Sequence, residues 1–265
     1  MKIKKTIALA LAAMAISATA FADVAVKGYD ITEDWVKMEV PQIKGAAGGS
    51  VADAKINKAL NFNALMQLYS PLPQGRDGED TMRTSFEYKF SGKNGVREAR
   101  EFLEDVGGFV DYSLHSSWYE AKTLGGSLVE RYGLDGKYDV LYNGSNLLSV
   151  EQRGYLFTGG AHGMTLYKVS TFDLTTGNEL QLADLFKPGT NYLERINEIV
   201  AKKVAAQPEK FYGPVEVKDG DQFYFDGKVL VITYAPYEVA PYAAGVVSFV
   251  IPRGQLSGIM ADNVK

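Results

Sequence analysis

The sequence has 265 residues, a formal net charge of −4 at pH 7 and no cysteine. The lack of cysteine excludes disulfides, thiol catalysis and thiolate metal ligands. The negative balance argues against nucleic acid as a partner, because nucleic acid needs clustered positive charge. With 46% hydrophobic residues, a chain of this length can bury one large core or two smaller ones.

The first 22 residues have the three-part pattern of a secretory signal peptide. Three lysines lie among the first five residues, residues 7–20 are apolar, and Ala20-Phe21-Ala22 is a small-x-small cleavage signal. The apolar run is too short to span a bilayer comfortably, and no later stretch approaches the ~20 apolar residues that a span needs. We therefore predict cleavage after Ala22 and a periplasmic or secreted protein without a membrane anchor. Losing the lysines makes the mature chain more acidic, which would suit a basic partner but is also ordinary for a soluble surface.

The mature chain is expected to begin with a strand and a helix. Apolar and charged residues alternate over 36–40, which predicts a half-buried strand that ends at Pro41 and the glycine-rich run behind it. Ser50 and Asp53 resemble a capping box before a helix over 51–69. Three further elements are predicted, a polar loop, a strand and a short helix, over residues 71–81, 84–90 and 96–106.

From Phe109 onward, short apolar and aromatic runs alternate with turn dipeptides, which predicts an antiparallel meander that includes a strand in 178–186. The turns are expected at dipeptides that supply positive φ: Gly125-Gly126, Asp135-Gly136, Asn143-Gly144, Gly159-Gly160 and Thr176-Gly177. Within the strand near 164–174, the period of two assigns side chains to opposite faces. Leu166, Lys168, Ser170 and Phe172 share one face, and Tyr167, Val169 and Thr171 share the other.

The clearest helical pattern follows Pro188-Gly189, with Thr190 as a candidate cap. Its apolar stripe consists of Leu193, Ile196, Val200 and Val204, and Lys202 and Lys203 near its end suit the helix dipole. Two more strand patterns follow, with a turn at Asp226-Gly227. Runs of strands with a few segregated helices indicate an α+β fold. We expect two mixed domains, 23–163 and 164–265, each an antiparallel sheet with helices packed on one side.

No motif for catalysis, metal binding or cofactor binding is present. The sequence lacks G-x-S-x-G, H-E-x-x-H and phosphate-loop patterns. Asp219-Gly220-Asp221 resembles part of a calcium loop, but turns use the same residues. The two histidines are His115, in a mixed strand pattern, and His162, which lies among glycines. A glycine-flanked histidine suits a fixed catalytic residue, and equally one whose ring caps loop carbonyls.

Two motifs carry a family resemblance. The first is "YLFTGGAHG", from Tyr155 to Gly163, and the second is "YAPYEVAPYAAG", from Tyr234 to Gly245. With their flanking strands they resemble the paired extracytoplasmic domains of unknown function found in the anti-sigma factor RsiV and in the N-terminal part of the peptidoglycan deacetylase PdaC. The resemblance extends over roughly 29–256, with 71–108 as an expansion of the first domain.

The resemblance implies an exported binding module rather than an enzyme, because the deacetylase chemistry of that family belongs to a separate domain. The RsiV ectodomain binds lysozyme. The implied partners here are lysozyme, another cell-wall enzyme or peptidoglycan itself, with no cofactor. The residues proposed for binding are His162, Gly160, Tyr237, Glu238 and Tyr242.

Two other interpretations of the motifs stay open. One is a small hydrolase of envelope polymers, with His162 as the base and Glu238 as its orienting acid. The other is purely structural: Pro236 and Pro241 fix the backbone, Gly245 permits close packing, and the motifs lock the two domains together. The discriminating question is whether His162 contacts the 236–245 loop.

Overall fold

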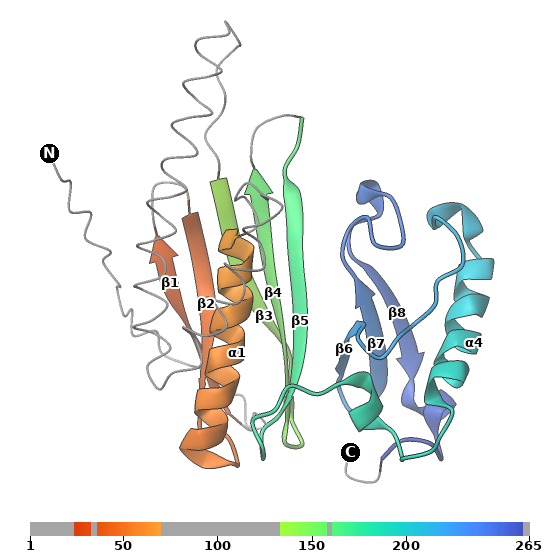
Figure 1. Ribbon diagram of the computed structural model, residues 1–265, viewed down its shortest axis with the longest axis horizontal. Coiled ribbons are helices and arrows are strands. Elements are labelled where there is room, and N and C mark those ends of the chain that lie inside the picture. The colour runs from red at the N-terminus through yellow and green to blue at the C-terminus, as the bar shows by residue number, and fades with distance from the viewer. Residues whose placement is uncertain (1–23, 33–35, 70–132, 158–160, 262–265) are drawn as a thin grey trace, which may run out of the picture.

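The computed structural model describes residues 24–32, 36–69, 133–157 and 161–261 (Figure 1). The predicted signal peptide, the elements predicted over 71–106 and His115 lie outside these residues. The α+β fold with two domains is confirmed. Within the described ranges, no helix is both long and apolar enough to cross a membrane.

A five-stranded sheet and one helix form the N-terminal part. The strand order is β1-β2-β3-β4-β5. The elements are β1 (Ala25–Thr32), β2 (Val36–Lys44), α1 (Gly49–Tyr69), β3 (Gly133–Gly144), β4 (Leu147–Phe157) and β5 (Met164–Asp173). The sheet is mixed, because β2 and β3 pair in parallel while the other neighbours are antiparallel.

A three-stranded antiparallel sheet and one helix form the C-terminal part, on the far side of β5 from β1 (Figure 1). Its elements are α4 (Tyr192–Ala205), β6 (Gln222–Phe225), β7 (Val229–Tyr234) and β8 (Val247–Pro252), preceded by a 3-10 helix, Leu182–Leu185. The division between residues 163 and 164 stays a prediction. β5, which begins at Met164, pairs with β4 and also contacts β6.

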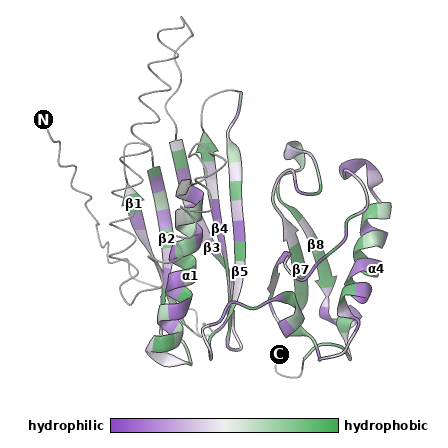
Figure 2. Ribbon diagram, viewed as in Figure 1, coloured by the Kyte–Doolittle hydropathy of each residue, from purple (hydrophilic) through white to green (hydrophobic). Residues whose placement is uncertain are grey.

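Each sheet buries a core against its helix. On the N-terminal side, Ile56 and Leu60 of α1 pack with Leu148 and Phe172 of the sheet. On the C-terminal side, the hydrophobic residues of β7 and β8 (Figure 2) pack against α4. The predicted stripe on α4 is confirmed, with Ile196, Val200 and Val204 buried and Leu193 partly buried.

Two residues predicted to interrupt the strands lie inside them. Pro41 belongs to β2, whose pairing with β3 ends at Met38, so the proline lies where β2 is paired on one side only. Gly136 belongs to β3 rather than to a turn, and a Cβ there would lie 2.8 Å from the Met38 side chain. Gly136 is therefore explained by close packing between neighbouring strands.

The β3–β4 turn is displaced from the predicted Asn143-Gly144. Gly144 is the last paired residue, opposite Leu147, and Ser145 and Asn146 form the two-residue loop with φ of 51° and 59°. A tight turn of this kind needs positive φ at both central positions. Asn143 instead donates from Nδ2 to the Val24 carbonyl.

The strand predicted in 178–186 is also wrong. Only isolated bridges form there, from Glu179 to Phe172 and from Phe186 to Met260, and the 3-10 helix lies between them. Leu182, Leu185 and Phe186 are all buried. Their spacing of three and four residues places them on one side of a helical turn, which a strand would not do.

The predicted helix caps are replaced by other bonds. The Asp53 carboxylate accepts from the backbone N–H groups of Gly45 and Ala46, and Ser50 lies within α1. Thr190 donates to the Lys187 carbonyl, and α4 begins after Asn191 without a side-chain cap.

Gly49→Ala and Gly177→Ala separate backbone strain from crowding. The two glycines have φ of +69° and +73°, so alanine should cost each roughly 1–2 kcal/mol for the left-handed backbone. A Cβ at Gly49 meets nothing within 4 Å, whereas one at Gly177 lies 2.6 Å from the Ala52 Cα. We expect Gly177→Ala to lower the free energy of unfolding by about 1–3 kcal/mol more than Gly49→Ala. Equal losses in urea titrations would contradict this packing of α1 on the 173–177 turn.

Candidate functional site

His162 lies in a turn that is held against β4. The Gly163 N–H donates to the Tyr155 hydroxyl over 2.9 Å, and Nδ1 of His162 lies 2.9 Å from the Gly163 carbonyl oxygen. A Cβ at Gly163 would lie 2.5 Å from the Leu156 carbonyl oxygen. Gly163 is therefore required by close approach of the chain, and it leaves the His162 ring exposed.

The 234–245 loop is fixed by its own polar groups. The Glu238 carboxylate accepts from the Ala235 N–H over 2.7 Å. Tyr237 has φ of +74° and is 47% exposed, a backbone conformation that is uncommon for a bulky residue. Pro236 is buried, and the described chain contains no cis peptide bond. The loop thus holds an exposed tyrosine in a strained conformation.

The two motifs meet through their aromatic rings. The His162 ring stacks on Tyr242 with centroids 4.8 Å apart and planes 16° apart. Tyr242 in turn contacts the Tyr237 ring at 5.4 Å, and its hydroxyl lies 3.5 Å from the Thr165 hydroxyl. We call His162, Tyr242 and Tyr237 the ring stack. Of the five residues proposed from sequence, these three adjoin one another, Glu238 braces the loop, and Gly160 lies outside the described residues.

A polar seam continues from the ring stack along β5. The Gln222 side chain accepts from the Val169 N–H over 2.6 Å, and the Thr171 hydroxyl donates to the Phe223 carbonyl over 3.0 Å. Leu147 of β4 joins the C-terminal core. The sequence pattern placed Tyr167, Val169 and Thr171 on one face but gave no sign that this face meets the C-terminal sheet.

Among the residues along the seam, Tyr167 has a strongly raised pKa. Thr233 and Glu151 lie near its hydroxyl, and Glu151 is ion-paired with Arg153. Burial, and secondly the Glu151 carboxylate, hold the pKa of Tyr167 well above its ordinary value. This hydroxyl therefore remains protonated and can donate in the folded protein at every physiological pH.

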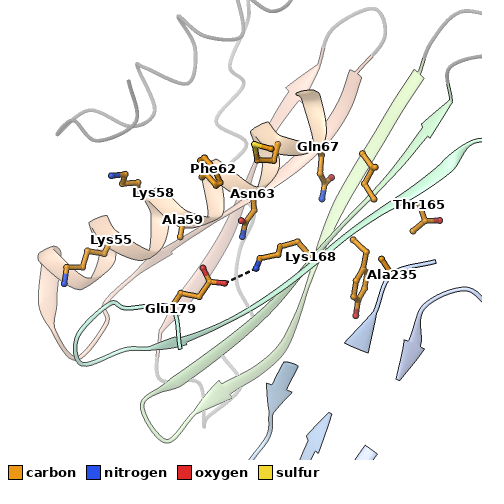
Figure 3. Close-up of a pocket in the computed structure, with 13 residues that line it drawn as sticks. Lys55, Lys58, Ala59, Phe62, Asn63, Gln67, Thr165, Lys168, Glu179 and Ala235 are labelled. Atoms are coloured by element: carbon orange, nitrogen blue, oxygen red, sulfur yellow. Dashed lines mark ion pairs between the residues drawn. The ribbon is translucent and has the colours of Figure 1, made fainter. Parts of the chain in front are cut away.

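A groove of about 740 Å³ opens between α1 and β5 (Figure 3). One wall is α1, with Lys58, Phe62 and Asn63, and the other is the 165–168 segment of β5. Ala235 lies at one end of the groove, so the groove reaches the loop that carries the ring stack. Sequence reasoning missed this groove, because only the packing of α1 beside β5 creates it.

The aspartates that resembled a calcium loop are engaged by tyrosines. The Tyr192 hydroxyl donates to Asp219, and the Tyr234 hydroxyl donates to Asp221. Burial and the bond to Asp219 raise the pKa of Tyr192 to about 12. These carboxylates fix the 218–222 turn to the C-terminal domain.

Comparison with models of known protein families shows to which family the chain belongs. The family model described as deacetylase PdaC matches residues 29–165, just over half of the chain. The chain belongs to this family. A second model, for a protein of unknown function (DUF3298), matches residues 183–254. The first match ends within β5 and contains the first motif, and the second match begins after β5 and contains the second motif.

One curated relative of this PdaC-family chain is similar over about half of the chain. The peptidoglycan-N-acetylmuramic acid deacetylase PdaC of Bacillus subtilis (strain 168) is 21% identical over 141 residues, which is 50% of this chain. The chain spans 30% of that protein's length.

Two solved structures share the fold of the PdaC-family chain. A DUF3298 family member from Bacteroides fragilis NCTC 9343 has a TM-score of 0.68 at 15% identity, covering 92% of this chain and 96% of that one. A DUF3298 family protein from Pseudomonas aeruginosa PAO1 has a TM-score of 0.54 at 17% identity, covering 91% and 96%. Both match across the two domains, so the two-domain arrangement is common to these proteins.

A double-mutant cycle measures the contact between the motifs. We expect His162→Ala and Tyr242→Ala to show a coupling of about 0.5–1.5 kcal/mol in the free energy of unfolding, as stacked aromatic pairs do. The Phe186–Tyr192 stack, with centroids 4.6 Å apart, is the matched positive control. Purely additive losses for the His162 pair, beside coupling in the control, would contradict the ring stack.

The raised pKa of Tyr167 predicts that the folded protein loses stability at alkaline pH. Because its pKa is raised by folding, its stabilising contribution is complete below about pH 10 and is lost as the pH rises further. We expect Tyr167→Phe to show a shallower fall in unfolding free energy between pH 9 and 11 than the wild type, because phenylalanine has no ionisable hydroxyl. Identical slopes for wild type and Tyr167→Phe would contradict the prediction.

Proposed function

We propose that this PdaC-family chain is an exported, non-enzymatic binding module of the bacterial envelope whose ligand is the glycan of peptidoglycan. The observation that carries the proposal is the ring stack, in which residues of both domains present aromatic surface at the end of the seam. Export rests on the predicted signal peptide. A link to peptidoglycan is supported by the name of the Bacillus subtilis relative.

The ring stack has the composition that a glycan needs. One face of a pyranose ring consists of C–H groups, which pack on aromatic rings, while its hydroxyls need polar partners at the rim. His162 and Tyr237, the two ends of the stack, are exposed, and Tyr242 between them is half-buried. The Tyr242 hydroxyl and the Thr165 hydroxyl supply polar groups beside the rings.

The backbone at Tyr237 favours a binding function for this residue. A non-glycine residue at positive φ costs stability, and such strain persists where the surroundings impose it, often at functional sites. Here the strain keeps a large aromatic side chain 47% exposed, although burial would be more favourable for its ring. Contact with a ligand would supply that burial.

Hydrolysis by His162 and Glu238 receives no support from the geometry. A general base and its orienting acid lie within hydrogen-bond reach of each other. In the described chain, His162 bonds the Gly163 carbonyl and Glu238 bonds the Ala235 N–H, with no hydrogen bond between the two side chains. A binding role is compatible with both positions, because it requires no hydrogen bond between the two side chains.

Binding to purified peptidoglycan tests the proposal. We expect the wild-type chain to bind soluble glycan fragments in the tens of micromolar range by calorimetry, and to cosediment with insoluble peptidoglycan. Tyr237→Asn keeps a residue that tolerates positive φ and removes the ring, so affinity should fall about 10-fold, equivalent to ~1.4 kcal/mol of lost ring contact. Tyr237→Phe should retain binding.

Tyr212→Ala is the matched control, because it removes an exposed tyrosine of the same domain that is outside the ring stack. Equal affinity of Tyr237→Asn and wild type, or no binding of peptidoglycan at all, overturns the proposal. Lysozyme is tested in parallel; binding of lysozyme alone would replace the glycan with a protein ligand.

A further inference from the structure

The outer edge of β5 has backbone groups that face away from β4. The Val169 N–H donates to the Gln222 side chain, the Thr171 carbonyl accepts from the Leu180 N–H, and the Asp173 N–H donates to the Asn178 carbonyl. All three residues are odd-numbered. In an antiparallel pair, alternate residues direct both backbone groups to the neighbouring strand or away from it.

The same alternation applies to the other half of β5. The β4–β5 pairing shows no register shift from Leu147 opposite Asp173 to Leu156 opposite Met164. The N–H and C=O groups of Thr165 and Tyr167 therefore also point away from β4. No described residue forms a hydrogen bond with these four groups. The 164–168 part of β5 is thus an open sheet edge.

This open edge forms one wall of the groove beside α1 (Figure 3). Thr165 to Lys168 line it from β5, and Phe62, Asn63 and Met66 line it from α1. The groove volume is about 740 Å³. An extended peptide placed against a sheet edge forms main-chain hydrogen bonds with it, and its alternate side chains enter the pockets on either side. Here one set of side chains would face α1.

The charge of the groove selects the kind of peptide. Lys55, Lys58 and Lys168 line it with one acid, Glu179. Lys168 is paired with Glu179 at 3.2 Å, and Lys55 bonds the Thr176 carbonyl and Asn178. Lys58 is exposed and has no ion pair among the described residues. The groove therefore has an excess of positive charge in a chain that is acidic as a whole.

We propose that this groove binds an extended acidic segment of a partner protein, which adds to the edge of β5 as a sixth strand. The site adjoins the ring stack at Thr165, whose hydroxyl lies beside Tyr242, but strand addition does not depend on glycan binding there. The backbone groups of Thr165 and Tyr167 select an extended peptide. The cation of Lys58 selects an acidic one.

The probe for this site is a synthetic nine-residue peptide in which valine and glutamate alternate. We expect it to bind the wild-type chain and to slow amide hydrogen exchange at Thr165 and Tyr167. Two control peptides separate the contributions. One has N-methyl groups on every second backbone nitrogen and is made in both registers, and the register that removes the donors facing β5 should bind at least 10-fold more weakly. The other replaces each glutamate with lysine and should not bind.

Lys58→Glu should weaken binding of the glutamate peptide by about 10-fold, whereas Lys202→Glu, at an exposed lysine on α4, should leave it unchanged. Tyr237→Asn should also leave peptide affinity unchanged, so failure of this site and failure of the glycan site are distinguishable.

Three results would overturn the inference. The first is equal binding of the unmodified peptide and both N-methylated registers, because strand addition requires the main-chain donors. The second is slowing of the Thr165 and Tyr167 amides by glycan fragments that compete with the peptide, which would make the groove part of a glycan site. The third is protection of the same amides in a self-associated chain without peptide, with the oligomer seen by sedimentation, which would make the occupant a second copy.

Discussion

The period of two along β5 is the constraint on which both domains depend. Ser170 and Phe172 face α1, where Ser170 accepts from Asn63 and Phe172 is fully buried. Val169 and Thr171 lie at the alternate positions and bond Gln222 and Phe223 of the C-terminal sheet. A slip of one residue would exchange these two sets and break both interfaces at once. The register of β5 therefore fixes the N-terminal core and the position of the C-terminal domain together.

The periodicity of the sequence was sufficient to predict those elements that pair or pack with segments close to them along the chain. The β3–β4–β5 hairpins and α4 follow from alternation and from the apolar stripe at Ile196, Val200 and Val204. Alternation also separated the two faces of β5 correctly. The parallel pairing of β2 with β3 was not predictable in this way, because it joins segments that are far apart along the chain. The strand predicted in 178–186 failed because the burial of Leu182 and Leu185 follows a helical rather than a strand period.

The candidate site was predictable in its residues but not in its geometry. The motifs singled out His162, Tyr237 and Tyr242, yet only tertiary structure shows that their rings stack. The groove had no sequence signal. Asn63 and Gln67 of α1 are buried and bond Ser170 and the Gln152 carbonyl of the sheet. These bonds join α1 to β5 and β4 beside the groove, whose lining includes both residues.

The ring stack can exist only while the two domains are paired. His162 belongs to the turn that enters β5, and Tyr242 and Tyr237 belong to the loop after β7. The seam beneath them combines polar bonds, such as that from the Val169 N–H to Gln222, with Leu147 inserted in the C-terminal core. Separating the domains would exchange those polar bonds for bonds to water and would expose Leu147 and its apolar neighbours, so the loss of apolar burial is the main cost of separation. A ligand that contacts rings from both sides would therefore add to the seam's stability, and binding and domain pairing would reinforce each other.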